Sequence, residues 1–151
     1  MTSFTAPDPA FEARVRASFE RQGIMRLIGA RMTRVEPGRV EIELPYRADL
    51  TQQHGYFHAG VTSTIADSAG GYAGYTLFPA ASSVLTVEYK MNLVAPADGE
   101  KLVAIGQVKK SGRSLTVCEL EVRAVKGGAA RPCAYGLQTL MCMMGRADAP
   151  A

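Results

Sequence analysis

Residues 61–78 read VTSTIADSAGGYAGYTLF, and this stretch decides the architecture of the chain. Its bulky apolar side chains recur every three to five positions, which is the spacing of a helix. They are Val61, Ile65, Tyr72 and Leu77, with Ala69 and Ala73 between them. Most other positions hold Ala, Gly, Ser or Thr, and Asp67 is the only charged residue. A helix with almost no polar face is normally buried, so the sequence predicts one central, buried helix.

Asp67 is a costly residue inside such a helix. A buried carboxylate needs hydrogen bonds, a charged partner or a ligand to offset its desolvation. One interpretation is a working acid in a functional site, where carboxylates in unusual surroundings are concentrated. The other is a structural acid that caps a neighbouring loop. The spacing of the residues leaves both open.

The distance between Asp67 and the start of the helix indicates an oligomer. Gly60 lies seven residues before Asp67, which puts both on nearly one helix face, about 10 Å apart. The first turn of a helix has free N–H groups and a partial positive charge, which suit a developing oxyanion. Catalytic contacts run to about 3 Å, so a single carbonyl group cannot reach both residues. Two antiparallel copies of the helix would bring them together, with close approach allowed at Gly70, Gly71 and Gly74. The sequence thus predicts a dimer with composite sites.

The flanking segments predict an α+β fold. Four strands are expected after the helix, because apolar runs are separated by short turns that contain Gly or Pro. They are Val84 to Leu93, Lys101 to Lys110, Ser114 to Ala124 and Arg131 to Met143. Short turns between sequential strands imply an antiparallel meander. Before the central helix, the pattern predicts a short amphipathic helix and then two strands joined by a Pro-Gly turn. These are Asp8 to Arg21, Leu27 to Val35 and Arg39 to Leu44. The expected architecture is one long helix wrapped by an antiparallel sheet of about six strands.

Length and composition describe an ordinary globular domain. The 151 residues are 47% hydrophobic and 21% charged. Residues 1–151 are therefore expected to form a single domain, with loose termini at 1–7 and 146–151. No apolar run is long enough to span a bilayer and no secretory signal is visible, so no membrane partner is expected. The net charge of +3, without a run of Lys or Arg, argues against nucleic acid.

The cysteines and histidines indicate the compartment and argue against a metal site. Cys118, Cys133 and Cys142 are odd in number and lie in apolar segments. Buried thiols in a reducing compartment are expected, which predicts a cytoplasmic protein. The two histidines and three cysteines have no metal-ligand spacing, so no metal is expected.

The residues before the central helix resemble a known family. Residues 52–60 read QQHGYFHAG, and Asp67 follows seven residues later. This stretch resembles the Asn-x-x-Gly-x-x-His-Gly-Gly motif and downstream Asp of hotdog acyl-CoA thioesterases of the phenylacetate-degradation (PaaI-like) type. The resemblance continues through residues 86–92, 95–97 and 110–115, and covers most of the chain from Gly23 to Met143. It implies a hotdog fold, an acyl-CoA substrate, no cofactor apart from the coenzyme A of the substrate, and a homodimer or a dimer of dimers.

The resemblance also implies roles for single residues. Asp67 would be the nucleophile or the general base. The N–H of Ala59 or Gly60, at the helix start of the other subunit, would hold the thioester oxygen. His58 would orient that turn or polarise the thioester. Gln52 stands where the family often has Asn, and would position water or the carboxylate. Ala59 replaces the first Gly of the motif's pair, so a positive φ there would cost roughly 1 kcal/mol.

Further residues would surround the substrate. Thr86 matches a hydroxyl position near the attacking group. Two segments would line the coenzyme A channel, with positive charges at Lys109, Lys110 and Arg113 to attract its phosphates. The segments comprise Leu93, Val94, Ala95 and Pro96, and then Lys110, Ser111, Gly112, Arg113, Ser114 and Leu115. His54 would contact substrate or be only a loop residue, and the second segment would bind coenzyme A or be only a hairpin turn.

Three functions compete on this sequence. A thioester hydrolase needs a carboxylate, an oxyanion donor and water, and Asp67 with the turn at Ala59 and Gly60 supplies the first two. A non-catalytic acyl-thioester binding module would keep the channel but would not need the acid. A hotdog hydratase or dehydratase places its His and acid in Pro-rich or Asp-x-Asn-x-x-His patterns, which are absent here. The residues therefore favour the hydrolase, then the binding module, then the dehydratase.

Overall fold

The computed structural model describes residues 4–146 and 148–149. Two short helices come first, α1 (Phe11–Arg21) and α2 (Gly23–Ile28), followed by strands β1 (Arg31–Glu36) and β2 (Arg39–Pro45). A 3-10 turn at Ala48–Leu50 then leads to the long helix α3 (Ala59–Tyr75). Four long strands complete the order: β3 (Ser82–Leu93), β4 (Lys101–Ser111), β5 (Leu115–Lys126) and β6 (Ala129–Met144).

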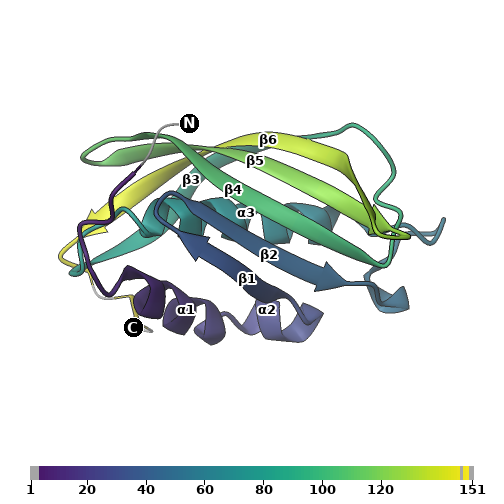
Figure 1. Cartoon of the computed structure of the whole chain (residues 1–151), viewed down its shortest axis with the longest axis horizontal. Helices are drawn as coiled ribbons and strands as arrows, with labels where there is room; N and C mark the ends of the chain where they lie inside the picture. Colours follow the sequence, from purple (N-terminus) through teal and green to yellow (C-terminus); the bar gives the residue numbers. More distant parts are fainter. Residues whose placement is uncertain (1–3, 147, 150–151) are drawn as a thin grey trace.

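One antiparallel sheet of six strands curves around α3 (Figure 1). The strand order is β1-β2-β4-β5-β6-β3. The predicted meander is confirmed for β4, β5 and β6 but is wrong for β3, which pairs with β6 at the edge of the sheet. Residues 94–100 cross the end of the sheet, so β4 does not lie beside the strand that precedes it in sequence. The predicted hotdog arrangement of a long helix wrapped by a sheet is confirmed.

The segment before β1 corrects a second prediction. The strand expected from Leu27 to Val35 is wrong in its first part, because residues 23–28 form α2. Met25 and Ile28 lie three positions apart and are both buried, so one helical face meets the core. Gly29 then adopts a φ of 77°, a left-handed conformation that favours glycine and ends the helix.

The glycines of α3 allow the helix to approach its own sheet. A Cβ added to Gly70 would overlap Gln138 and Leu120, and one added to Gly74 would overlap Leu140. The expectation that Gly70 and Gly74 accommodate a partner helix is therefore wrong, because side chains of β5 and β6 already occupy the space beside them.

The cysteines and the ends of the described chain have defined surroundings. Cys118, Cys133 and Cys142 are buried free thiols, as predicted. Of the termini expected to be loose, residues 1–3, 147 and 150–151 lie outside the described part of the chain. Phe4 packs against the core, and Asp148 forms an ion pair with Arg21. No helix formed by the described residues is long and apolar enough to cross a membrane.

Candidate active site

Asp67 projects from the middle of α3 toward β3 and β6. Its Oδ1 accepts a hydrogen bond of 2.7 Å from Thr86 Oγ1 and one of 2.6 Å from Gln138 Nε2. Oδ2 has no hydrogen-bond partner among residues 4–146 and 148–149. The expectation of a buried carboxylate is only half right, because Asp67 is partly exposed on one side. One carboxylate oxygen is thus anchored and the other is available for chemistry.

A cavity of about 130 Å³ opens beside Asp67. Most of its wall is polar, since hydroxyl, amide and carboxylate groups dominate the lining. The lining residues are Ser18, Gln22, Asp67, Ser68, Gly71, Tyr72, Val84, Thr86 and Asp148. Tyr72 Oη and Ser18 Oγ share a hydrogen bond of 3.1 Å, and burial raises the pKa of Tyr72 to about 12, so the phenol stays neutral. The cavity is large enough and polar enough to hold a water molecule next to the carboxylate.

His58 forms the N-cap of α3. Its Nδ1 accepts a hydrogen bond of 2.8 Å from the N–H of Gly60. An accepting Nδ1 carries no proton, so the neutral ring holds its proton on Nε2. The N–H of Gly60 is therefore occupied, whereas that of Ala59 has no partner within the described residues. Ala59 is the first residue of α3 and its φ is not positive, so replacing the motif's glycine with alanine introduces no backbone strain.

A second cavity, of about 270 Å³, lies at the start of α3. It brings together predicted site residues from three parts of the sequence, namely Gln52, Ala59, Leu93, Ala95 and Pro96. His54 and Val94 are exposed and do not line this cavity. Gln52 Oε1 accepts a hydrogen bond from the backbone N–H of His54, so Gln52 also stabilises its own loop.

The β4–β5 hairpin lies at the opposite end of the sheet from this cavity (Figure 1). β4, which has 11 residues, separates the two ends by about 35 Å. A single chain therefore does not bring residues 93–96 and 110–115 together. Within the hairpin, Lys109 forms an ion pair of 3.0 Å with Glu119. Lys110 and Arg113 are exposed and form no ion pair with any described residue.

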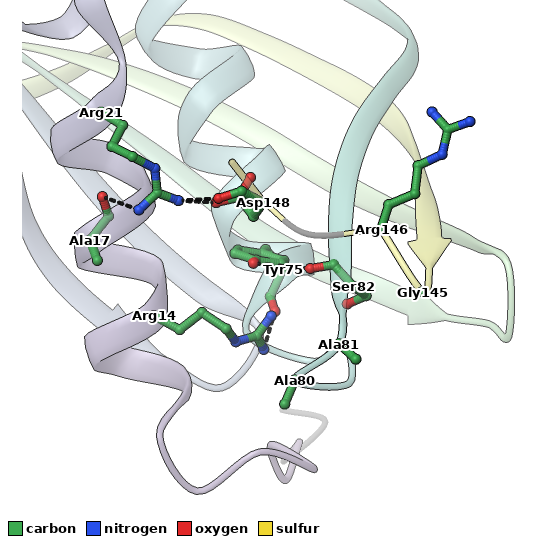
Figure 2. Close-up of a pocket in the computed structure, with 10 residues that line it drawn as sticks. All are labelled: Arg14, Ala17, Arg21, Tyr75, Ala80, Ala81, Ser82, Gly145, Arg146 and Asp148. Atoms are coloured by element: carbon green, nitrogen blue, oxygen red, sulfur yellow. Dashed lines mark hydrogen bonds and ion pairs between the residues drawn. The ribbon is translucent and has the colours of Figure 1, made fainter. Parts of the chain in front are cut away.

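Figure 2 shows a third cavity, of about 460 Å³, between α1 and the C-terminal segment. Arg14 lies 4.2 Å from the ring centroid of Tyr75 and donates a hydrogen bond of 2.8 Å to the backbone oxygen of Phe78. Arg21 Nη2 lies 2.6 Å from Asp148 Oδ2. The two arginines thus join α1 to the end of α3 and to the C-terminal segment, while Arg14 Nη1 is buried and has no hydrogen-bond partner among the described residues. Because Asp148 also lines the Asp67 cavity, its ion pair with Arg21 holds one wall of the candidate active site in place.

Sequence reasoning missed several residues of this site, among them Gln138, Ser18, Gln22 and Asp148. Gln138 lies in a predicted strand, but its outward neighbours there are as apolar as its inward ones. The alternation of apolar and polar residues therefore did not show which face of this strand packs against the helix. The one signal for Gln138 was a single amide side chain within an apolar run. Ser18 and Gln22 carry no local signal, since their place in the wall depends on how the α1 region packs against α3.

Within the part of the chain that the structure describes, no three His, Cys, Asp or Glu side chains are grouped so that they could hold a metal ion.

Comparison with known proteins assigns the family. The thioesterase superfamily matches residues 54–130, a range that contains the helix start, Asp67 and Thr86. A thioesterase family protein of known structure from Silicibacter pomeroyi is 45% identical, with a TM-score of 0.88 over 89% of this chain and 99% of that chain. The proofreading thioesterase EntH of Klebsiella pneumoniae is 27% identical over 85% of this chain and 93% of EntH. The PaaI protein from the phenylacetic acid degradation operon of E. coli, 18% identical, shares the fold with a TM-score of 0.79 over 90% of this chain and 95% of PaaI. The resemblance carried by the motifs is confirmed, and the chain belongs to the thioesterase superfamily.

Proposed function

We propose that this thioester hydrolase acts on acyl-CoA, with Asp67 as the acid that drives the reaction. The proposal rests on one observation, which is that hydrogen bonds hold the carboxylate of Asp67 in a fixed orientation. Thr86 and Gln138 hold Oδ1 of Asp67, and Oδ2 is left beside a polar cavity. A non-catalytic binding module has no need of an oriented carboxylate, so this arrangement supports hydrolysis over binding alone.

Two chemical routes use this carboxylate. As a general base, Oδ2 takes a proton from water while the water oxygen attacks the thioester carbonyl carbon. The carbon–sulfur bond then breaks, the proton held by Asp67 passes to the leaving sulfur, and the products are the free acid and the coenzyme A thiol. As a nucleophile, Oδ2 attacks the carbonyl carbon itself, coenzyme A leaves as the thiolate, and water hydrolyses the resulting anhydride. In both routes negative charge develops on the carbonyl oxygen, where N–H groups at a helix start stabilise it.

In this proposal the oxyanion donor is the N–H of Ala59, because that of Gly60 is occupied by His58, and it belongs to a second subunit. Ala59 and Asp67 are about 12 Å apart along one helix, which is too far for one carbonyl group. The two expected channel segments likewise lie at opposite ends of one sheet. A twofold dimer with antiparallel helices would bring the helix start of one subunit to the Asp67 and the hairpin of the other.

The edge strand β3 supports such a dimer. It has 12 residues and lies at the end of the strand order, so one side of its backbone is unpaired within the sheet. Leu85, Val87 and Tyr89 are exposed by 55%, 55% and 46%. A long apolar edge is a liability in a monomer, because it recruits other strands. Pairing of two β3 strands would cover this edge and place Thr86, near the middle of β3, close to the subunit interface.

The test is a hydrolysis screen with purified protein. Acyl-CoA esters from acetyl to palmitoyl, together with benzoyl-CoA and phenylacetyl-CoA, are supplied and the released thiol is measured. Asp67→Asn should keep the fold, because the amide oxygen can accept the same two hydrogen bonds, and should lower kcat at least ~100-fold. Asp49→Asn is the matched control, since Asp49 is exposed and paired with Arg47; its kcat should not change. No hydrolysis of any ester, or near-normal turnover by Asp67→Asn, would contradict the proposal.

A further inference from the structure

Gln138 is a buried polar side chain at the contact between β6 and α3. It is 1% exposed, and its Nε2 lies 2.6 Å from Asp67 Oδ1 and 3.0 Å from the backbone oxygen of Asp67. Its Oε1 is also buried and has no hydrogen-bond partner among the described residues. An unpaired buried carbonyl oxygen lowers stability. Gln138 therefore lowers the stability of the fold through its unpaired Oε1. Its contact with Asp67 offers a functional reason for a polar residue at this position.

The surroundings allow one orientation of the Gln138 amide. If the amide were turned, Oε1 would face the carboxylate and the backbone oxygen of Asp67, and three acceptors would repel one another. The Thr86 hydroxyl donates its proton to Asp67 and can in turn accept from Nε2 of Gln138, which lies 3.1 Å away. Gly70 gives Oε1 its space, because a Cβ at position 70 would overlap it. Gly70 thus allows Gln138 to lie against the helix at the height of Asp67.

We propose that Gln138 is a positioning residue of the active site, which fixes the side chain of Asp67 relative to its own helix and directs Oδ2 toward the substrate. This inference rests on the proposed function of Asp67. One nitrogen touches both the carboxylate and the backbone oxygen of Asp67, so rotation of the carboxylate away from the site breaks a hydrogen bond inside the protein. Thr86 alone does this less well, since it stands exposed on the edge strand.

The first experiment removes the amide and keeps the shape. Gln138→Met has similar length and no donor, so Asp67 loses its buried partner while the core stays filled. With butyryl-CoA and phenylacetyl-CoA as probes, kcat should fall about 10-fold to 100-fold, because the hydrogen bond that is lost is made to a charged group. KM should change less than about 2-fold, because Gln138 does not touch the substrate. Gln107→Met is the matched control on β4, where Gln107 donates to the backbone oxygen of Gly38; its kcat should equal that of the wild type.

A double-mutant cycle tests whether Gln138 acts through Asp67. In the Asp67→Asn background, adding Gln138→Met should lower the residual rate by less than about 2-fold, because the group that Gln138 positions is already lost. If Gln138 had a purely structural role, Gln138→Met would lower kcat by the same factor in the wild type and in Asp67→Asn.

A second experiment tests the contact between Gln138 and Asp67 through protein stability, without measuring catalysis. Gln138→Glu would put two carboxyl groups within hydrogen-bond distance, and their repulsion raises the pKa of the introduced group above its unfolded value. Stability is then fully present below the unfolded value of about 4 and is lost as the pH rises. The Tm deficit relative to the wild type should therefore grow between about pH 5 and about pH 8. Gln107→Glu, whose side chain would face Arg39, should show no such loss.

The other titratable groups near Gln138 do not imitate this signal. Tyr89 and Cys118 flank it on the neighbouring strands, and Tyr72 lies on α3. Burial raises the pKa of Cys118 and of Tyr72 to about 12, so neither changes charge between about pH 5 and about pH 8. Asp148, across the cavity, is paired with Arg21, and none of the substitutions changes either residue.

The outcomes separate this inference from the proposed function. If Asp67→Asn is inactive while Gln138→Met has wild-type kcat, Gln138 is not a positioning residue and only this inference is overturned. A Tm deficit of Gln138→Glu that does not change with pH overturns it as well. If Asp67→Asn is as active as the wild type, the proposed function fails and the catalytic part of this inference fails with it. A pH-dependent Tm deficit would then still confirm the contact between Gln138 and Asp67.

Discussion

Thr86 donates a hydrogen bond of 2.7 Å to Oδ1 of Asp67, and this contact ties the edge strand β3 to the central helix. The hydroxyl proton points at one oxygen of the carboxylate, which leaves the second oxygen for the reaction. Because Thr86 belongs to an edge strand, the same residue links the carboxylate to the side of the sheet where a second subunit is proposed to bind.

Replacing Thr86 tests the value of this hydrogen bond. Thr86→Val keeps the branched shape and removes the donor, and a hydrogen bond to a charged group contributes about 1.5–3 kcal/mol. We expect kcat to fall about 10-fold to 100-fold, whereas Thr86→Ser, which keeps the hydroxyl, should stay within about 3-fold of the wild type. Steady-state kinetics on acyl-CoA esters measure both. Equal kcat values for the two variants would show that the hydroxyl does not matter.

Ala59→Pro tests the oxyanion donor at the start of α3. Proline is well tolerated at the first helical position, and His58 already has the extended conformation (φ −65°, ψ 141°) that proline requires before it. The substitution removes the unpaired N–H of Ala59 without breaking the helix. Loss of one oxyanion donor should lower kcat about 100-fold to 1000-fold, while circular dichroism and Tm should change little.

Mixing this variant with Asp67→Asn tests whether the site is shared. In a composite dimer, one of the two mixed sites carries both lesions and the other carries neither. After complete subunit exchange, activity per subunit should recover to about one quarter of the wild type, since half of the dimers are mixed. If exchange is verified by mass spectrometry and no activity returns, the sites are not composite.

Arg113 tests the binding of coenzyme A by the β4–β5 hairpin. Arg113 has no ion-pair partner among the described residues, so its charge is available for a phosphate. Arg113→Ala should raise KM for acyl-CoA several-fold with little effect on kcat, and the effect should shrink as salt screens the charges. Arg34→Ala is the control, because Arg34 on β1 is already paired with Glu36 and Glu41. A KM that is unchanged at low salt would make residues 111–114 a hairpin turn and nothing more.

The buried thiols predict slow chemical labelling and a loss of stability at high pH. Burial raises the pKa of Cys118 to about 12 and that of Cys133 to about 11, and only the thiolate reacts. At about pH 8 the folded protein should therefore leave both unmodified by iodoacetamide, whereas protein in guanidinium chloride should be labelled at both. Because the folded pKa lies above the unfolded value of about 8.5, their contribution to stability is complete below that pH and is lost as the pH rises toward 11 or 12. Rapid labelling of either cysteine in the folded protein, located by peptide mass mapping, would contradict the prediction.

The sequence by itself determined most of the secondary-structure elements and the acidic residue of the candidate site, Asp67. The strands β2 to β6 begin and end within two residues of their predicted bounds, and α3 covers most of the predicted helix at 61–78. Each of these rests on a period or a turn that is encoded within a few residues. Asp67 was visible for the same reason, as the one charge in a helix built to be buried. The first part of the strand predicted from Leu27 was wrong, because residues 23–28 form α2, and a helix of under two turns is too short to show a clear period in the sequence.

The tertiary structure alone decided which elements meet. No local pattern shows that β3 leaves the meander and joins β6, and that pairing brings Thr86 to the side of Asp67. Gln138 reaches Asp67 across 71 residues of sequence, and Gly70 makes room for it. The face on which a strand residue lies depends on register, and a shift of one residue would turn Gln138 away from the helix. Register is set by the whole sheet, which is why the acid can be read from the sequence while the residue that holds it cannot.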